Sequence, residues 1–222
     1  MRRPKALLSW SSGKDAAWTL HVLRQQGEIE VAGLLTSVNA THERVAMHGV
    51  RDELLARQAL ATGLPLWRVE IPYPCPNDAY ERAMAAACAR AVAEGFTHVA
   101  FGDLFLEDVR KYREQKLAGT GLAPLFPLWG RDTRDLAREM VEAGLEARLV
   151  CVDPRQLDRS YAGRAFDARL LDELPAGVDP CGERGEFHTF CRAGPMFSAP
   201  IAVERGEVVE RDGFVFADLL PA

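Results

Sequence analysis

The chain has 222 residues, of which 48% are hydrophobic, and its formal net charge is -5 at pH 7. This length and apolar content suffice for one sizeable core, alone or with a smaller attached unit, and argue against disorder as the main state. The acidic balance argues against a nucleic-acid partner, which needs clustered Lys and Arg. Segment 1–10 has too short an apolar run for a signal peptide or a membrane span, so we expect a cytoplasmic protein with no membrane partner.

Strand-like and helical segments alternate along the first half of the chain. Short apolar runs are followed by stretches with helical spacing, and glycines such as Gly63 and Gly95 end the helices. In order, we expect a strand at 5–9, a helix from 15, a strand at 31–38, a helix at 50–61, a strand at 66–71, a helix at 77–93 and a strand at 97–101. This alternation predicts an α/β fold with a Rossmann-like parallel sheet that is covered on both faces.

The second half is predicted to be smaller and less regular. We expect helices at 107–117 and 133–143 and a strand at 146–152, after which prolines and glycines interrupt the pattern. The tail alternates apolar and polar residues around Asp212-Gly213, which predicts a hairpin. We place a boundary near Pro124, between a Rossmann-like domain at 1–123 and an α+β region at 124–222. Because no linker marks this boundary, we expect the two parts to share an interface.

The segment 9–16, Ser-Trp-Ser-Ser-Gly-Lys-Asp-Ala, stands where the first strand passes to the first helix. Backbone N–H groups at a helix start lack intrahelical acceptors, and the helix dipole adds positive charge there, so phosphate is a natural ligand. Ser11 and Ser12 add hydroxyl donors, Gly13 allows close approach and Lys14 supplies a charge. A capped helix start without a ligand is the alternative.

Gly102-Asp103 directly follows the predicted strand at 97–101, which places a carboxylate at the carboxyl edge of the sheet, where ligands of α/β proteins bind. Asp103 is a candidate to position metal or substrate, and the alternative is that it caps the next helix. On that helix Arg110 and Glu114 are four residues apart, which also fits a solvated ion pair.

Two later segments, 127–132 (PLWGRD) and 180–190 (PCGERGEFHTF), are expected to be loops with polar residues among aromatics. In the second, Glu183 and Glu186 lie three apart around glycines, a pattern that suits Mg2+ or a substrate amine. The alternative is an acidic surface turn. His188 by itself favours a hydrogen-bonding residue over a catalyst.

The five cysteines are an odd number without a CxxC pair, which favours a reducing compartment over a disulfide framework and disfavours zinc. Cys181 and Cys191 lie close to the segment with Glu183 and His188. We favour small apolar filler over a reactive pair for these two residues.

The segment 9–16 lacks the GxxxxGK[ST] and GxGxxG patterns but resembles the SGGxDS pyrophosphate loop of the N-type ATP pyrophosphatases. Segment 127–132 resembles PLWGRD, and 182–190 resembles GEGGE(Y/F)ETF, of the diphthine–ammonia ligase family, which is adenine nucleotide α-hydrolase-like. Met47-His48 and the stretch 58–66 fit the same family, so the likeness covers nearly the whole chain. The departures from its motifs are Ser12 for Gly, Ala16 for Ser, Arg184 for Gly and His188 for Glu.

The resemblance implies a HUP-type fold and an ATP-dependent, AMP-forming ligase that adenylates a carboxylate and amidates it with ammonia. Its first domain would bind ATP and its C-terminal region the substrate. The implied catalytic residues are Lys14, Asp15, Glu183 and Glu186. The implied nucleotide-binding residues are Ser9, Ser11, Ser12, Gly13, Lys14, Asp15, Leu35, Thr36, Ser37, His48, Gly102 and Asp103. The implied substrate-binding residues are Arg110, Arg131, Asp132, Gly182, Glu183, Gly185, Glu186 and His188. The implied Mg2+ ligands are Asp15, Glu183 and Glu186.

Two other functions stay open at this point. The first is a non-catalytic sensor of adenine nucleotides, in which Ala16 marks lapsed chemistry. The second is a tRNA-modifying thiolase, which would need Cys181 or Cys191 as sulfur carrier. The sequence leaves open the acceptor carboxylate, the ammonia source and the oligomeric state, for which a homodimer is one option.

Overall fold

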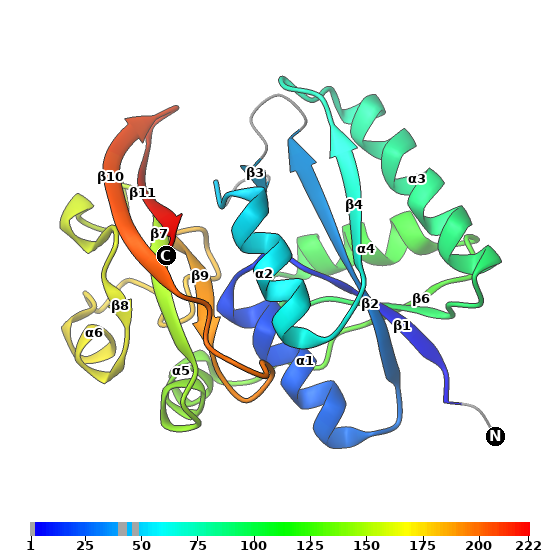
Figure 1. Cartoon of the computed structure of the whole chain (residues 1–222), viewed down its shortest axis with the longest axis horizontal. Coiled ribbons are helices and arrows are strands. Elements are labelled where there is room, and N and C mark those ends of the chain that lie inside the picture. The colour runs from blue at the N-terminus through cyan, green and yellow to red at the C-terminus, as the bar shows by residue number, and fades with distance from the viewer. Residues whose placement is uncertain (1–2, 40–43, 46–48) are drawn as a thin grey trace.

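The computed structural model describes residues 3–39, 44–45 and 49–222. Within them, five parallel strands in the order β4-β2-β1-β5-β6 form the first sheet (Figure 1). They are β1 (Lys5–Ser9), β2 (Glu30–Asn39), β4 (Leu66–Ile71), β5 (His98–Ala100) and β6 (Ala123–Leu125), and the short β3 (Arg44–Val45) pairs antiparallel with the end of β2. The Rossmann-like prediction is confirmed. Strand order reverses at β1, so the switch point lies at the carboxyl ends of β1 and β5.

Helices cover both faces of this sheet. They are α1 (Lys14–Gln26), α2 (Asp52–Thr62), α3 (Asn77–Ala93) and α4 (Glu107–Leu117). Neighbouring residues of β1 point to opposite faces, so Leu8 joins a core with α1 and α2, whereas Leu7 joins a second core with α3 and α4. No helix in the described part of the chain is long and apolar enough to cross a membrane.

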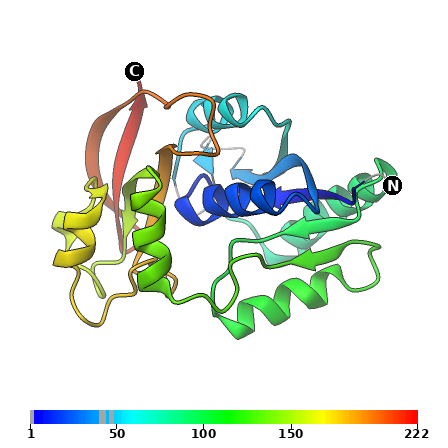
Figure 2. The same ribbon diagram turned by 90° about the horizontal axis from the view of Figure 1, so that it is seen from below.

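A second, antiparallel sheet follows in the chain and lies beside α1 and α2 (Figures 1 and 2). Its elements are α5 (Thr133–Glu142), β7 (Glu146–Val152), the 3-10 helix η1 (Arg159–Tyr161), β8 (Ala165–Phe166), α6 (Ala168–Glu173), β9 (Phe187–Ala193), β10 (Val203–Arg211) and β11 (Phe214–Pro221). Strand β7 pairs with β8, β9 and β11. The predicted hairpin is present as β10–β11, and its turn residues Asp212 and Gly213 have φ of 52° and 80°.

The expectation that the whole of segment 180–190 is a loop is wrong. The loop ends at Glu186, and Phe187–Ala193 form β9, which pairs with β7 along its length. Phe187, Thr189 and Phe190 are all buried. Because both faces of β9 are covered in this stretch, its residues do not alternate between apolar and polar, and the usual sign of a strand is missing.

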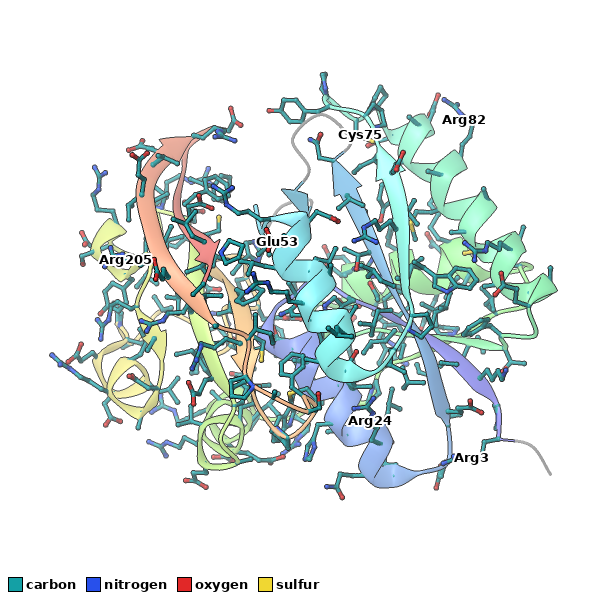
Figure 3. The ribbon with its side chains drawn as sticks, viewed as in Figure 1. Arg3, Arg24, Glu53, Cys75, Arg82 and Arg205 are labelled. Carbon is teal, nitrogen blue, oxygen red and sulfur yellow. The ribbon has the colours of Figure 1, made fainter. Side chains whose placement is uncertain are left out.

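The two sheets share one continuous core that includes residues of α1, α2, β7, β9 and β11. Polar contacts add to it: Arg24, at the C-terminal end of α1 in Figure 3, donates to the carbonyls of Met196 (2.9 Å) and Thr62 (2.6 Å). Arg51, beside α2, pairs with Asp218 of β11 at 2.6 Å. The expected interface is therefore present. The predicted division at residues 123 and 124 falls within β6 and stays a prediction.

Candidate active site

The segment predicted to bind phosphate connects β1 to α1 at the switch point of the first sheet. Gly13 is the N-cap of α1 and has no side chain that could cap the helix. Instead, the backbone N–H of Lys14 donates to Thr189 Oγ1 of β9 at 3.1 Å. The cap position is thus occupied by a glycine of the segment, and the alternative of a capped helix start without a ligand stays open. We refer to residues 9–15 as the phosphate loop.

Ser12 has two unusual features. Its φ is 70°, in the left-handed region where side chains are disfavoured, which explains why the related motif has glycine at this position. Its side chain is fully buried, and its hydroxyl has no hydrogen-bond partner among the described residues. Buried hydroxyl groups are normally satisfied, so an unsatisfied one at a helix N-terminus fits an anionic ligand such as the phosphates of ATP.

The start of the phosphate loop is held by β2 at Trp10. Trp10 N–H donates to the carbonyl of Leu35, and Thr36 Oγ1 donates to the carbonyl of Trp10, both at 2.8 Å. The predicted nucleotide residues Leu35, Thr36 and Ser37 thus lie within β2, and the first two contact the loop. Ser9 is the last residue of β1 and pairs with Leu35. His48 lies outside the described residues.

Gly102 and Asp103 also lie at this edge. A Cβ at Gly102 would come within 3.0 Å of the Asp15 carbonyl carbon and 3.1 Å of Thr19 Oγ1, so glycine lets the chain after β5 pass close to the first turn of α1 without displacing it. Asp103 forms an ion pair with Arg113 at 3.4 Å. The N-cap of α4 is Leu106, so the alternative that Asp103 caps this helix is wrong.

The side chain of Lys14 is buried and points toward the C-terminal region. Its ammonium donates to both carboxylate oxygens of Asp15 at 2.9 Å and to the carbonyl of Cys181. It also lies 5.5 Å from the ring centre of Phe166 and 5.6 Å from that of Phe187. Burial is the largest single influence and lowers the pKa of Lys14, but Asp15, Cys181 and Glu183 together raise it by more, so the pKa lies above its ordinary value. Lys14 therefore stays charged and links the phosphate loop to segment 179–186.

Segment 179–186, which we call the acidic loop, is organised by Glu186. This residue is buried, and its two carboxylate oxygens accept hydrogen bonds from the backbone N–H groups of Asp179 and Arg184, each at 2.9 Å. Gly182 has a φ of 70°, and a Cβ there would lie 2.7 Å from the carbonyl oxygen of Phe187. Gly185 also has a positive φ, of 84°. The acidic loop is therefore a rigid, internally satisfied turn.

Glu183 reaches from the acidic loop to the edge of the first sheet. Its Oε1 accepts a hydrogen bond of 2.7 Å from the backbone N–H of Leu104. Burial, helped by the carboxylates of Asp15 and Asp103, raises the pKa of Glu183 to about 7, although the N–H of Leu104 and the charge of Lys14 act to lower it. The structure thus brings together predicted site residues that lie about 170 positions apart in the chain.

The predicted Mg2+ ligands do not form a ready-made metal site. Within residues 3–39, 44–45 and 49–222, no three His, Cys, Asp or Glu side chains are placed to hold a metal ion. Asp15 is bonded through both oxygens to Lys14, and Glu186 through both oxygens to backbone N–H groups. In this arrangement neither carboxylate is available as a protein ligand.

The remaining predicted substrate residues have structural partners. Arg110 forms an ion pair with Glu114 at 2.8 Å, which confirms the expected i,i+4 pair. Arg131 forms a bidentate ion pair with Glu139. Asp132 caps α5 by accepting from the N–H groups of residues 134 and 135. Burial lowers the pKa of His188 to about 4, so this residue is neutral. Their roles toward a substrate stay predictions.

The two cysteines of the thiolase alternative are buried thiols. Cys181 Sγ lies 3.4 Å from the carbonyl of Thr133, and Cys191 Sγ lies 3.5 Å from that of Ala193. Burial raises the pKa of both thiols. Because a sulfur carrier needs an accessible thiolate, these positions fit the filler interpretation better.

Sequence reasoning did not assign a role to Gln58 or Thr189, although both contact the phosphate loop. Gln58 is a buried polar residue on the face of α2 that also carries Leu54, Leu55 and Ala59. A polar side chain in such an apolar stripe was the available signal, because a buried amide must find hydrogen-bond partners. Thr189 gave no comparable signal, since β9 itself was not predicted.

Comparison with known proteins agrees with this geometry. The model of the diphthamide synthase C-terminal domain matches residues 132–217, which include the acidic loop and β9. The mouse diphthine–ammonia ligase is 32% identical, in a match that covers 93% of this chain and 85% of the mouse protein. The chain belongs to the diphthine–ammonia ligase family. The zebrafish relative of the same name is 29% identical over 86% of the chain. The human one is 35% identical over 50% of the chain, a match that spans 44% of the human protein, less than half of its length.

The four residues that depart from the family motifs lie near the candidate site. Ser12 and Ala16 are buried in the phosphate loop and the first turn of α1. Arg184 lies in the acidic loop with its guanidinium 5.6 Å from the ring centre of Phe105, and His188 lies in β9, opposite Cys151. In this member of the diphthine–ammonia ligase family, each departure therefore falls in or next to one of the two loops.

Proposed function

We propose that the chain is an ATP-dependent ligase that adenylates a carboxylate, with release of pyrophosphate, and then converts it to an amide with ammonia. The observation that carries the proposal is the unsatisfied, buried hydroxyl of Ser12 at the N-terminus of α1, with Glu183 brought to the same edge. Family membership supports it, since the relatives are named diphthine–ammonia ligases. Chemistry of this type depends mainly on positioning and on charge neutralisation.

In this proposal the phosphate loop binds the β and γ phosphates of ATP. The hydroxyl groups of Ser11 and Ser12 and the backbone N–H of Gly13 donate to them, and Lys14 contributes a fixed positive charge. Leu35 to Ser37, Gly102 and Asp103 line the remainder of the nucleotide. The α phosphate then faces the acidic loop, where the acceptor carboxylate binds in the C-terminal region.

Glu183 is suited to the amidation step. Attack by ammonia requires a base that removes a proton, and a group with a pKa near the working pH serves best. The pKa of Glu183, raised by burial to about 7, meets this condition. We therefore assign proton transfer in the second step to Glu183.

Mg2+ bound to the ATP phosphates would neutralise charge on the leaving pyrophosphate. Magnesium held this way needs only one or two protein carboxylates. Of the three predicted ligands, Glu183 is the one whose carboxylate is not bonded through both oxygens in this structure. The cytoplasmic location and a homodimer stay predictions.

Incubation with ATP, Mg2+, ammonium and diphthine, the acceptor that the relatives' name indicates, tests the proposal. We expect AMP and pyrophosphate in equal amounts, and their formation should be lost in Lys14→Ala. ATP that binds to saturation but stays intact with diphthine and with a panel of other carboxylic acids would instead favour a nucleotide sensor. Absence of any binding of ATP would contradict both functions.

A further inference from the structure

We propose that Gln58 is a positioning residue for the phosphate loop: its side-chain amide fixes the direction of the peptide groups that receive the phosphates. This inference rests on the proposed function, since it assumes that the loop binds phosphate. It concerns a residue of α2 that lies outside the loop and outside both motifs.

The amide of Gln58 makes three hydrogen bonds to two separate parts of the chain. Its Nε2 donates to the carbonyls of Ser12 (3.0 Å) and Cys191 (2.7 Å), and its Oε1 accepts from Trp10 Nε1 at 2.9 Å. The side chain is fully buried. The reverse amide orientation would place NH2 against the indole N–H and oxygen against two carbonyls, so the partners allow one orientation only.

These bonds determine where the N–H of Gly13 points. The carbonyl of Ser12 accepts from Gln58 and also from the N–H of Cys191 at 2.9 Å, so it is held toward β9 and α2. In a trans peptide the carbonyl and the following N–H point in opposite directions. The N–H of Gly13 is therefore turned to the other side of the loop, where it lies 3.4 Å from Ser11 Oγ. This is the side on which the Ser11 hydroxyl lies.

The same bonds maintain a backbone conformation that Ser12 would not adopt alone. A φ of 70° is disfavoured for serine, and such conformations persist only where the surroundings impose them. On the other side of Ser11, the indole of Trp10 is bound to the same amide, while the backbone of Trp10 is held by Leu35 and Thr36. Gln58 thus holds both ends of the stretch from Trp10 to Ser12.

Few other side chains could replace this amide. Methionine has nearly the same length but no donors or strong acceptors, and glutamate would turn an acceptor oxygen toward two carbonyls. Asparagine keeps the amide but is one methylene shorter, so it cannot reach all three partners. Without the amide, the Ser12 carbonyl keeps only its bond from the N–H of Cys191, so the Ser12–Gly13 peptide is held less firmly and the N–H of Gly13 is less fixed on the phosphate side.

The test compares Gln58→Met and Gln58→Glu with Leu55→Ala in the full chain. Leu55 is a matched control because it is fully buried on the same helix, and its removal weakens the core without removing a hydrogen bond to the loop. Calorimetry measures affinity for ATP, inorganic pyrophosphate and adenosine, and thermal unfolding is followed in parallel. We expect both Gln58 variants to lose at least tenfold in affinity for ATP and pyrophosphate but less than twofold for adenosine. Leu55→Ala should keep all three affinities within threefold despite a lower Tm.

A spectroscopic readout separates positioning from general destabilisation. The indole N–H proton resonance of Trp10, assigned through Trp10→Phe, should move in Gln58→Met and stay in place in Leu55→Ala. If Gln58→Met does not fold, Gln58→Asn replaces it in the same comparison, with an expected affinity between those of the parent and Gln58→Glu.

Two results would overturn the inference alone: a parent that binds pyrophosphate while the Gln58 variants bind it equally well, or a Leu55→Ala variant that loses pyrophosphate affinity to the same extent. A parent that binds neither ATP nor pyrophosphate would overturn the proposed function, and the inference with it. The parent titration therefore distinguishes the two failures.

Discussion

The phosphate loop and the acidic loop meet where the ammonium of Lys14 donates to the carbonyl of Cys181, but they are built in opposite ways. In the phosphate loop, Ser12 has a disfavoured φ and a buried hydroxyl without a partner among the described residues. In the acidic loop, Glu186 satisfies two backbone N–H groups, and the turn is complete without a ligand. The difference indicates that the first loop is shaped to receive a ligand, whereas the second is a rigid support that carries Glu183 to the site.

The largest expected effect on stability comes from removing the carboxylate of Glu186, which organises the acidic loop. Glu186→Ala leaves the buried N–H of Asp179 and the partly buried N–H of Arg184 without their charged acceptor, and each such loss costs about 1–3 kcal/mol. We expect the free energy of unfolding to fall by about 4 kcal/mol in urea titrations. The exposed Glu207→Ala serves as control and should change it by less than about 0.5 kcal/mol. A loss of similar size in both variants would show that Glu186 does not organise its loop.

The link between the two loops is tested by Lys14→Met. This change removes the ammonium from Asp15 and Cys181 and leaves a partly buried carboxylate unpaired, for which a loss of about 3 kcal/mol in unfolding free energy is expected. ATP affinity should fall as well, because the positive charge of Lys14 in the phosphate loop is lost. Lys111→Met, which affects an exposed pair with Glu107, should leave both quantities nearly unchanged. Wild-type ATP affinity in Lys14→Met would contradict the assigned role.

A smaller, pH-dependent effect is expected at Glu183. Its pKa is raised from 4.5 to about 7 in the folded protein, so the folded state holds the proton more tightly than the unfolded chain does. The resulting stability is present below about pH 4.5 and is lost as the pH rises through 7. Glu183→Gln, which does not ionise, should therefore be more stable than the parent at pH 8 by about 2 kcal/mol, with little difference at pH 4.5. Urea titrations at four pH values measure this, and a constant difference at all four would exclude the assigned cause.

The smallest expected effect sharpens the account of the phosphate loop. Ser12→Gly relieves the positive φ and removes an unsatisfied buried hydroxyl, so we expect the free energy of unfolding to rise by about 1 kcal/mol despite the greater freedom of glycine when unfolded. Affinity for ATP should fall at the same time by about fivefold, equal to one ordinary hydrogen bond. Thermal unfolding and calorimetry measure the two changes. Unchanged ATP affinity would mean that the hydroxyl does not bind phosphate.

Local patterns in the sequence were sufficient for most of the first sheet and for the position of the phosphate loop. The predicted segments 66–71, 77–93, 107–117 and 146–152 coincide with β4, α3, α4 and β7, because their periodicity and the residues that end them are local signals. The start of α1 after a turn that contains serines and a glycine could likewise be predicted from the sequence. These features depend on residues that are close together in the chain.

The long-range contacts that hold the site together could not be predicted from local patterns. The bond from Gln58 to Cys191 joins residues 133 positions apart, and the bond from Lys14 to Thr189 joins residues 175 positions apart. The inward direction of the Lys14 side chain also depends on Phe166 and Phe187, which reach it only through the packing of the second sheet. Such contacts depend on how the two sheets meet, which no short pattern contains.

A crystal structure with Mg2+ and an ATP analogue that has a methylene group between the α and β phosphates tests the central claim most directly, because this analogue cannot be cleaved there. The account predicts the β and γ phosphates against Ser11, Ser12 and Gly13 at the start of α1, with the α phosphate turned toward Glu183. A nucleotide bound elsewhere, for example in the cavity between α3 and α4, with the phosphate loop empty and unchanged, would contradict it.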